Sequence, residues 1–185
     1  LFKIKQAQAT VTEVNASNKQ GYNFEVIASA VAKINTDVAA LKQGLKARDI
    51  DTKALQSYEL ILKDAGNRLE KVKNALMKSN DNLQQMMEKV LTLSNDTVLV
   101  DDQTENADKV LYSNQLKVIK LRLQNTGEVT GANLERSGKL LAEVSAIDIL
   151  INDLKTAVAD RLQQQGKIAL GREVPVLWES TLWAN

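Results

Sequence analysis

Several aspartates of this chain are candidate ligands for a metal ion. Asp148 and Asp153 lie in a mostly apolar stretch, and paired carboxylates inside a helical bundle can hold a di-metal centre. Such centres also use histidine from Glu-x-x-His motifs, and the chain has no histidine. Asp96, Asp101 and Asp102 lack the alternating Asp-x-Asp-x-Asp-Gly spacing that surrounds calcium. We therefore expect no metal site and interpret Asp101 or Asp102 as a helix cap.

Two residue types that many enzymes use in catalysis, histidine and cysteine, are also missing. The absence of histidine and cysteine from all 185 residues removes thiol nucleophiles, the usual zinc ligands and the usual general base. Neither the GxxxxGK[ST] nor the GxGxxG spacing of phosphate-binding loops occurs, and no strand is predicted before Gly127–Gly131. We expect a protein that is not an enzyme and needs no cofactor.

Basic side chains are densest at Lys117, Lys120 and Arg122, where they alternate with apolar residues. On a helix Lys117 and Lys120 share a side, whereas Arg122 points elsewhere. The whole chain has 24 basic and 23 acidic residues, so it lacks the excess of positive charge typical of nucleic-acid binding. We interpret the cluster as a solvated helix face and expect no nucleic-acid partner.

The segment 171–185 differs in kind from the rest. It contains both tryptophans of the chain, Trp178 and Trp183, beside Leu177 and Leu182. In one interpretation these side chains cover an open end of a helical bundle. In the other they anchor a protein partner or a membrane interface, where tryptophan combines a large apolar area with one polar group. These four residues are the candidate partner-binding residues.

A long stripe of apolar residues supplies the strongest structural signal. Its members are spaced alternately three and four residues apart, which keeps one face of a helix towards its partners. Met86 lies on the stripe, so core packing explains it better than an adaptable binding surface with Met87. Only Ser79 interrupts the series: Leu55, Tyr58, Leu62, Ala65, Leu69, Val72, Leu76, Leu83, Met86, Val90 and Leu93. We predict a helix over 53–94, with Asp51 or Thr52 as its N-cap.

Two weaker stripes precede this helix. The first contains Leu1, Ile4, Val11 and Val14, with Gln8 in the intervening position. The apolar spacing weakens before Gly21, and we expect one helix over 1–48; two helices hinged at Gly21 are the alternative. The second stripe is Phe24, Ile27, Val31, Ile34, Val38, Leu41 and Leu45.

Two further helices are predicted after a loop, over 103–126 and 131–168. Glycines at 127, 131 and 138 mark the break between them, and a strict stripe resumes at Leu140, Val144, Ile147, Ile151, Leu154 and Val158. The sequence predicts an all-α fold: residues 1–170 form an elongated antiparallel four-helix bundle with coiled-coil-like heptad packing. Residues 171–185 form a tail or a short helix.

Three functions are compatible with such a bundle. The first is a non-catalytic module for protein–protein interaction or scaffolding, within a larger or processed protein, which binds a partner or associates with itself through helix faces. The second is the extracytoplasmic sensory domain of a membrane receptor. The third is a helical domain of a secreted toxin or translocator that acts on membranes. No stretch approaches the roughly 20 apolar residues of a membrane span. Membrane contact is expected only through the tryptophan tail or a part of the parent protein outside this chain. Localisation is undetermined, with a secreted or cell-envelope protein favoured.

Overall fold

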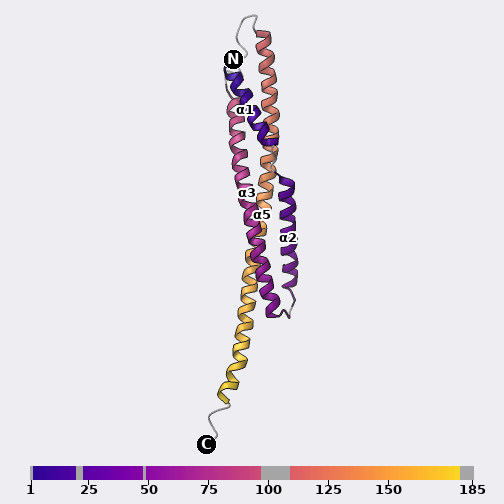
Figure 1. Cartoon of the computed structure of the whole chain (residues 1–185), viewed down its shortest axis with the longest axis vertical. Coiled ribbons are helices and arrows are strands. Elements are labelled where there is room, and N and C mark those ends of the chain that lie inside the picture. The colour runs from indigo at the N-terminus through magenta and orange to yellow at the C-terminus, as the bar shows by residue number, and fades with distance from the viewer. Residues whose placement is uncertain (1, 20–22, 48, 97–108, 180–185) are drawn as a thin grey trace. The chain divides into compact units, whose positions relative to one another are not determined.

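The computed structural model describes residues 2–19, 23–47, 49–96 and 109–179, and at 2, 19, 109–112 and 169–179 it describes the backbone alone. Every regular element in this part of the chain is a helix: α1 (Phe2–Lys19), α2 (Phe24–Gly44), α3 (Thr52–Ser94) and α5 (Lys109–Glu179) (Figure 1). The predicted all-α class is confirmed, whereas several helix ends differ from the prediction.

Helix α3 follows the prediction from 53–94 closely. The Asp51 side chain caps it, since Oδ1 accepts a hydrogen bond from the Ala54 N–H at 2.6 Å. The leucines of the long stripe are buried, and Ser79 keeps its place among them with 9% of its surface exposed. Burial of each such leucine contributes about 1.5–3 kcal/mol, so this seam is the main reason why α3 is a continuous helix.

The prediction of one helix over 1–48 is wrong, because α1 ends at Lys19 and α2 begins at Phe24. The alternative of two helices is the correct one, although Gly21 itself lies outside the described residues. The apolar seam also shifts by one position in α1. Ala7 is fully buried, whereas Gln8, the predicted occupant, is exposed.

The predicted break between 126 and 131 is also wrong. Helix α5 runs without interruption for 71 residues, through Gly127, Gly131 and Gly138. A glycine inside a helix costs only about 1 kcal/mol, less than the burial of a single leucine, so tertiary packing outweighs it. The two helices predicted over 103–126 and 131–168 therefore belong to a single helix, described from Lys109 onward. The segment after 168, predicted as a tail or a separate short helix, belongs to α5 as far as Glu179.

The described helices divide into two compact units, each of which combines segments from distant parts of the sequence. Unit 1 contains residues 1–28 and 73–142, and unit 2 contains residues 29–72 and 143–185. Helices α2, α3 and α5 contribute residues to both units, whereas α1 belongs to unit 1 alone.

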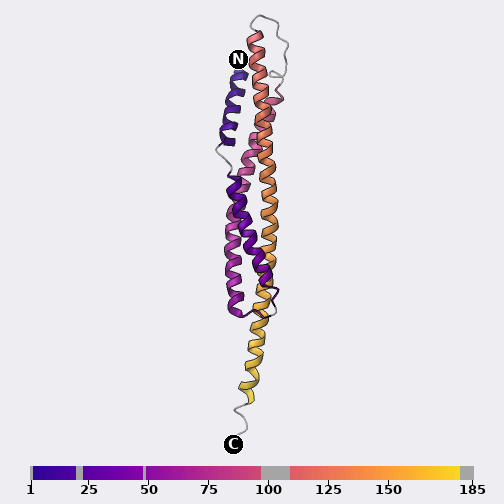
Figure 2. The same cartoon turned by 90° about the vertical axis from the view of Figure 1, so that its right-hand side faces the viewer.

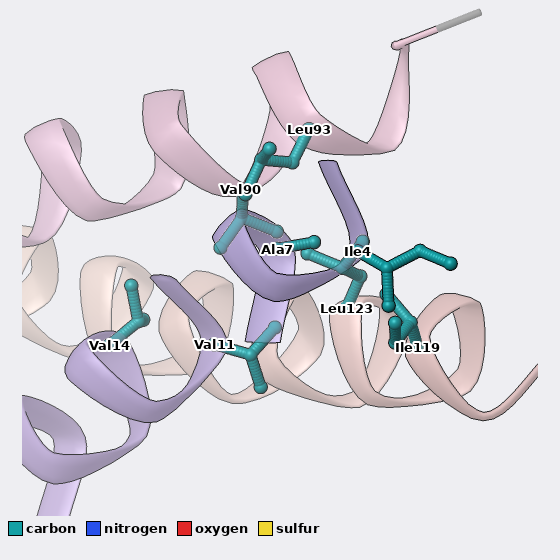
Figure 3. Close-up of a cluster of buried hydrophobic side chains, with 8 residues drawn as sticks. All are labelled: Ile4, Ala7, Val11, Val14, Val90, Leu93, Ile119 and Leu123. Carbon is teal, nitrogen blue, oxygen red and sulfur yellow. The ribbon is translucent and has the colours of Figure 1, made fainter. Parts of the chain in front are cut away.

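In unit 1, α1 lies beside α3 and α5 (Figure 1). It runs antiparallel to α3, because Lys3 forms an ion pair with Asp96 at 2.6 Å and Glu13 forms one with Lys89 at 2.9 Å. A buried apolar cluster joins the three helices (Figure 3): Ile4, Ala7, Val11, Val14, Val90, Leu93, Ile119 and Leu123. These contacts hold α1 in a fixed register against α3 and α5.

In unit 2, α2 takes the corresponding place beside α3 and α5 (Figure 2). Arg68 pairs with Asp37 at 3.1 Å. Helix α5 is tied to the segment before α3, since Gln165 Nε2 donates to the Ile50 carbonyl at 2.6 Å and Arg161 donates to the Ala47 carbonyl at 3.1 Å. The predicted stripes meet in its core: Val31, Ile34, Val38, Leu41, Leu45, Leu55, Leu62, Ala65, Leu69, Val144, Ile147, Ile151, Leu154 and Val158.

Candidate functional site

The four residues predicted to bind a partner are only partly covered by the structure. Leu177 and Trp178 belong to α5, which changes the expected tail into a continuation of the helix, and only their backbone is described. Leu182 and Trp183 lie outside the described residues. The partner-binding role of all four residues stays a prediction.

The charged side chains considered in the sequence lie on helix surfaces. Lys117, Lys120 and Arg122 are all exposed on α5, as expected of a solvated face. Among the residues that the structure describes, no three acidic side chains come together in a way that could hold a metal ion. Val118 and Leu121, which alternate with these basic residues, are also exposed, at 49% and 61%. The buried face of α5 is therefore narrow in this segment.

A layer of polar side chains interrupts the apolar core of unit 1. We name it the polar layer: Asn15 and Asn18 on α1 with Thr126, Thr130 and Asn133 on α5. The Thr126 hydroxyl donates to Asn15 Oδ1 at 3.2 Å, and Asn18 Nδ2 donates to the Thr130 hydroxyl at 3.0 Å. Asn133 Nδ2 donates to Asn18 Oδ1 at 3.3 Å. Thr126 and Thr130 are almost completely buried, so these bonds give both threonines the partners that buried polar groups require.

Two serines extend the polar character of this core. Ser137 on α5 is fully buried and Ser79 on α3 is 9% exposed, and neither hydroxyl has a hydrogen-bond partner. Hydroxyl groups buried without a partner lower stability, by about 1–3 kcal/mol each. Unit 1 therefore combines an apolar cluster with a region of buried polar side chains, some of which have no hydrogen-bond partner.

The sequence contained a signal for this polar layer. After Leu123 the three-four spacing continues without a gap through positions 126, 130, 133 and 137 to Leu140. All four intervening positions hold Thr, Asn or Ser, so a search for apolar residues alone finds a break there. The nearby glycines favour the same break between two helices, so the sequence pattern does not predict the polar layer.

An open apolar groove lies between α3 and α5 in unit 1. We name it the apolar groove, a hollow of about 330 Å³ lined by Gln84, Met87, Glu88, Leu91, Thr92, Asn95 and Leu134. Leu91 is 51% exposed. On the α5 side, the absence of a side chain at Gly131 leaves room for Met87, whose Cε would lie 3.5 Å from a Cβ there. Apolar side chains gathered in an open hollow are typical of protein-binding surfaces.

A second groove lies between α1 and α3 and is more polar. Its volume is about 520 Å³, and Glu13 and Lys89, which form the ion pair across it, are among its lining residues. Glu88 and Thr92 line both grooves, so one face of α3 separates them. Seven of its eight lining residues carry polar or charged groups, which makes this groove a weaker candidate than the apolar groove for an apolar partner.

One exposed ion pair lies on α5, between Glu135 and Lys139. Lys139 donates a hydrogen bond to Glu135 at 2.6 Å, one helical turn away. That hydrogen bond and the positive charge of Lys139 lower the pKa of Glu135 from its ordinary value of 4.5. Both side chains are largely exposed, so the pair lies on the surface of α5 and forms no reactive site.

Comparison of the chain with family models, with curated proteins and with solved structures gave no match. Among the described residues, no helix is both long enough and apolar enough to cross a membrane. The helices and grooves themselves are therefore the basis for assigning a function to this chain.

Proposed function

We propose that this chain is a non-catalytic module that binds another protein and acts as a scaffold within a larger or processed protein. The apolar groove of unit 1 is the observation that carries this proposal. Met87, Leu91 and Leu134 present apolar surface in an open hollow, and Gln84, Thr92 and Asn95 in the same lining carry groups that can form hydrogen bonds. Apolar surface combined with hydrogen-bonding groups is usual in a protein interface.

The proposed architecture is an elongated antiparallel bundle with coiled-coil-like heptad packing. The buried three-four seams of α3 and α5 support it, as do the antiparallel contacts between α1 and α3. Such a bundle offers long helix faces to a partner and needs no special catalytic residue. Binding through side surfaces is then the simplest use of the fold.

The test compares two matched variants at exposed leucines. Leu91→Glu places a charge in the apolar groove, whereas Leu60→Glu places the same charge at a 68% exposed position of unit 2. A photo-reactive amino acid at Gln84 captures partners in an extract of the source cells, and mass spectrometry identifies them. We expect a discrete cross-linked partner with the native chain and with Leu60→Glu, and its loss with Leu91→Glu. If capture is equal in all three proteins, the apolar groove does not carry the interaction.

A sensory domain of a membrane receptor is the second candidate, and one observation favours it. A receptor transmits signals through continuous helices, and α5 passes through Gly166 without a break. Its test is the thermal stability of the purified chain with candidate small ligands, because a ligand that binds only the folded state raises the melting temperature. A rise with one ligand class and no captured protein partner would support the sensory domain over the scaffold.

A further inference from the structure

We propose that the surface beneath α1 also accepts α1 from a second copy of the chain, so that two copies exchange this helix reciprocally. We name this surface the α1 site: Val90, Leu93, Ile119, Leu123, Thr126 and Thr130. The inference rests on the proposed function, because it specifies a partner for the interaction module. The α1 site shares no residue with the apolar groove, so the two can be tested separately.

Among the side chains that the structure describes, those that α1 buries are smaller than those that α2 buries. Four side chains of α1 enter the cluster in Figure 3, namely Ile4, Ala7, Val11 and Val14. One of these is alanine and two are valines, so the apolar area that these four described side chains bury is small. Helix α2 contributes a larger set: Phe24, Val31, Ile34, Val38 and Leu41.

Hydrogen bonds and an ion pair also position α1. The hydrogen bonds of Asn15 and Asn18 with α5 hold its carboxyl-terminal half, and the ion pair of Glu13 with Lys89 links it to α3. Water can replace such partners, so polar contacts contribute little net stability although their geometry is specific. They fix the register in which α1 binds without making its release costly.

The chemistry of the α1 site specifies its occupant. Without α1, the apolar side chains of Val90, Ile119 and Leu123 would face water, and the buried hydroxyl of Thr126 would lose its Asn15 partner. The occupant must therefore be a helix with small apolar residues at three-four spacing, followed by amides opposite both threonines. Helix α1 has this pattern, and reciprocal exchange between two copies restores each contact in both of them. In one chain, α1 is tethered beside its own α1 site, and a short linker gives such a helix an effective concentration in the millimolar range. Exchange between copies therefore increases as the concentration of the chain approaches that value.

The natural absence of cysteine allows a direct experiment on the full chain. One batch carries Asn18→Cys and the other carries Thr130→Cys, at positions whose side chains are hydrogen-bonded at 3.0 Å. The two batches are mixed at high concentration and treated with a short bismaleimide. Each chain has a single thiol, so a cross-link between positions 18 and 130 joins two copies, and it exceeds the yield of random collision only when α1 of one copy lies on α5 of the other. We expect at least about fivefold more cross-linked dimer than in the control, and less on dilution.

The control pair is Ala9→Cys with Asn125→Cys, both at exposed positions, which measures cross-linking by random collision. The double variant Asn18→Cys/Thr130→Cys, treated when dilute, must cross-link within one chain. The proposal is overturned if the mixed batches give no more dimer than the control pair, or if the double variant does not cross-link. Either result leaves partner capture at the apolar groove unaffected, so it is distinguishable from failure of the proposed function.

Discussion

Thr130 is fully buried, and its hydroxyl both donates and accepts a hydrogen bond. It donates to the Thr126 carbonyl at 2.7 Å and accepts from Asn18 at 3.0 Å. Ser137, seven residues further along the same face, is equally buried and has no partner. Two fully buried hydroxyls thus differ in hydrogen bonding, which makes the energetic role of the polar layer measurable.

Removal of these two hydroxyls is expected to have different effects. Thr130→Val keeps the shape of the side chain and removes its hydrogen bonds, so the free energy of unfolding should fall by about 1 kcal/mol. Ser137→Ala removes a buried group that has no partner, and the free energy of unfolding should stay the same or rise. Urea unfolding followed by circular dichroism measures both. Equal losses in the two variants would show that the hydrogen bonds of Thr130 contribute nothing specific.

The pair of Glu135 and Lys139 predicts a dependence on pH at the residue scale. Lys139 lowers the pKa of Glu135 below 4.5 in the folded chain, so the pair stabilises the fold above the unfolded pKa. This contribution is lost as the pH falls through the lowered, folded pKa. Carbon-detected NMR titration should show the Glu135 pKa rising towards 4.5 in Lys139→Met. An unchanged pKa in that variant would mean that Lys139 is not its cause.

Helices with strict apolar spacing could be predicted from the sequence, and those with mixed spacing could not. Helix α3 matches its prediction because nearly every seam position is apolar and Asp51 supplies a cap. The sequence predicts two helices in place of α5, because polar residues occupy its seam positions and the local glycine signals are read without tertiary context. It also favours one helix over 1–48, which is wrong, and offers the separation of α1 from α2 only as the alternative. The apolar groove could not be predicted, since it depends on which faces of α3 and α5 meet.

Alanine at the glycines of α5 tests the continuity of this helix. Gly138 is exposed, and a Cβ there would meet no atom within 4 Å, so Gly138→Ala should raise the free energy of unfolding by about 0.5–1 kcal/mol. A Cβ at Gly127 would lie 3.4 Å from Val90 Cγ1, so Gly127→Ala should gain less. Thermal unfolding compares the two variants. A loss of stability in Gly138→Ala would indicate that the helix is broken there after all.

The seam of α3 gives a second test at the element scale. Leu69 is 1% exposed, so Leu69→Asp buries an unpaired charge and should lower the free energy of unfolding by about 3–5 kcal/mol. Lys71 is exposed two residues away, and Lys71→Asp should change it by less than about 0.5 kcal/mol. Similar melting temperatures for the two variants would contradict the register assigned to α3.

At the scale of the whole molecule, the central question is whether the helix seams close within one chain or are shared between chains. A seam satisfied internally and a seam shared by two copies have the same sequence pattern, so the sequence leaves both possible. The α1 site is filled in both states, by α1 of the same chain in one and by α1 of a second copy in the other, through the same contacts. The balance between the states is therefore set by concentration, and it can be shifted by a substitution in α1 alone.

Light scattering measures this balance without any label. We expect a mass near 20.4 kDa in dilute solution and a rise with concentration as α1 exchanges between copies. Val11→Asp places a charge at a position that is 4% exposed, so α1 should bind neither site and the rise should disappear. Ala9→Asp places the same charge at an exposed position of α1 and should preserve the rise. A dimer that persists on dilution and in Val11→Asp would instead mean that a face other than the α1 site joins the copies.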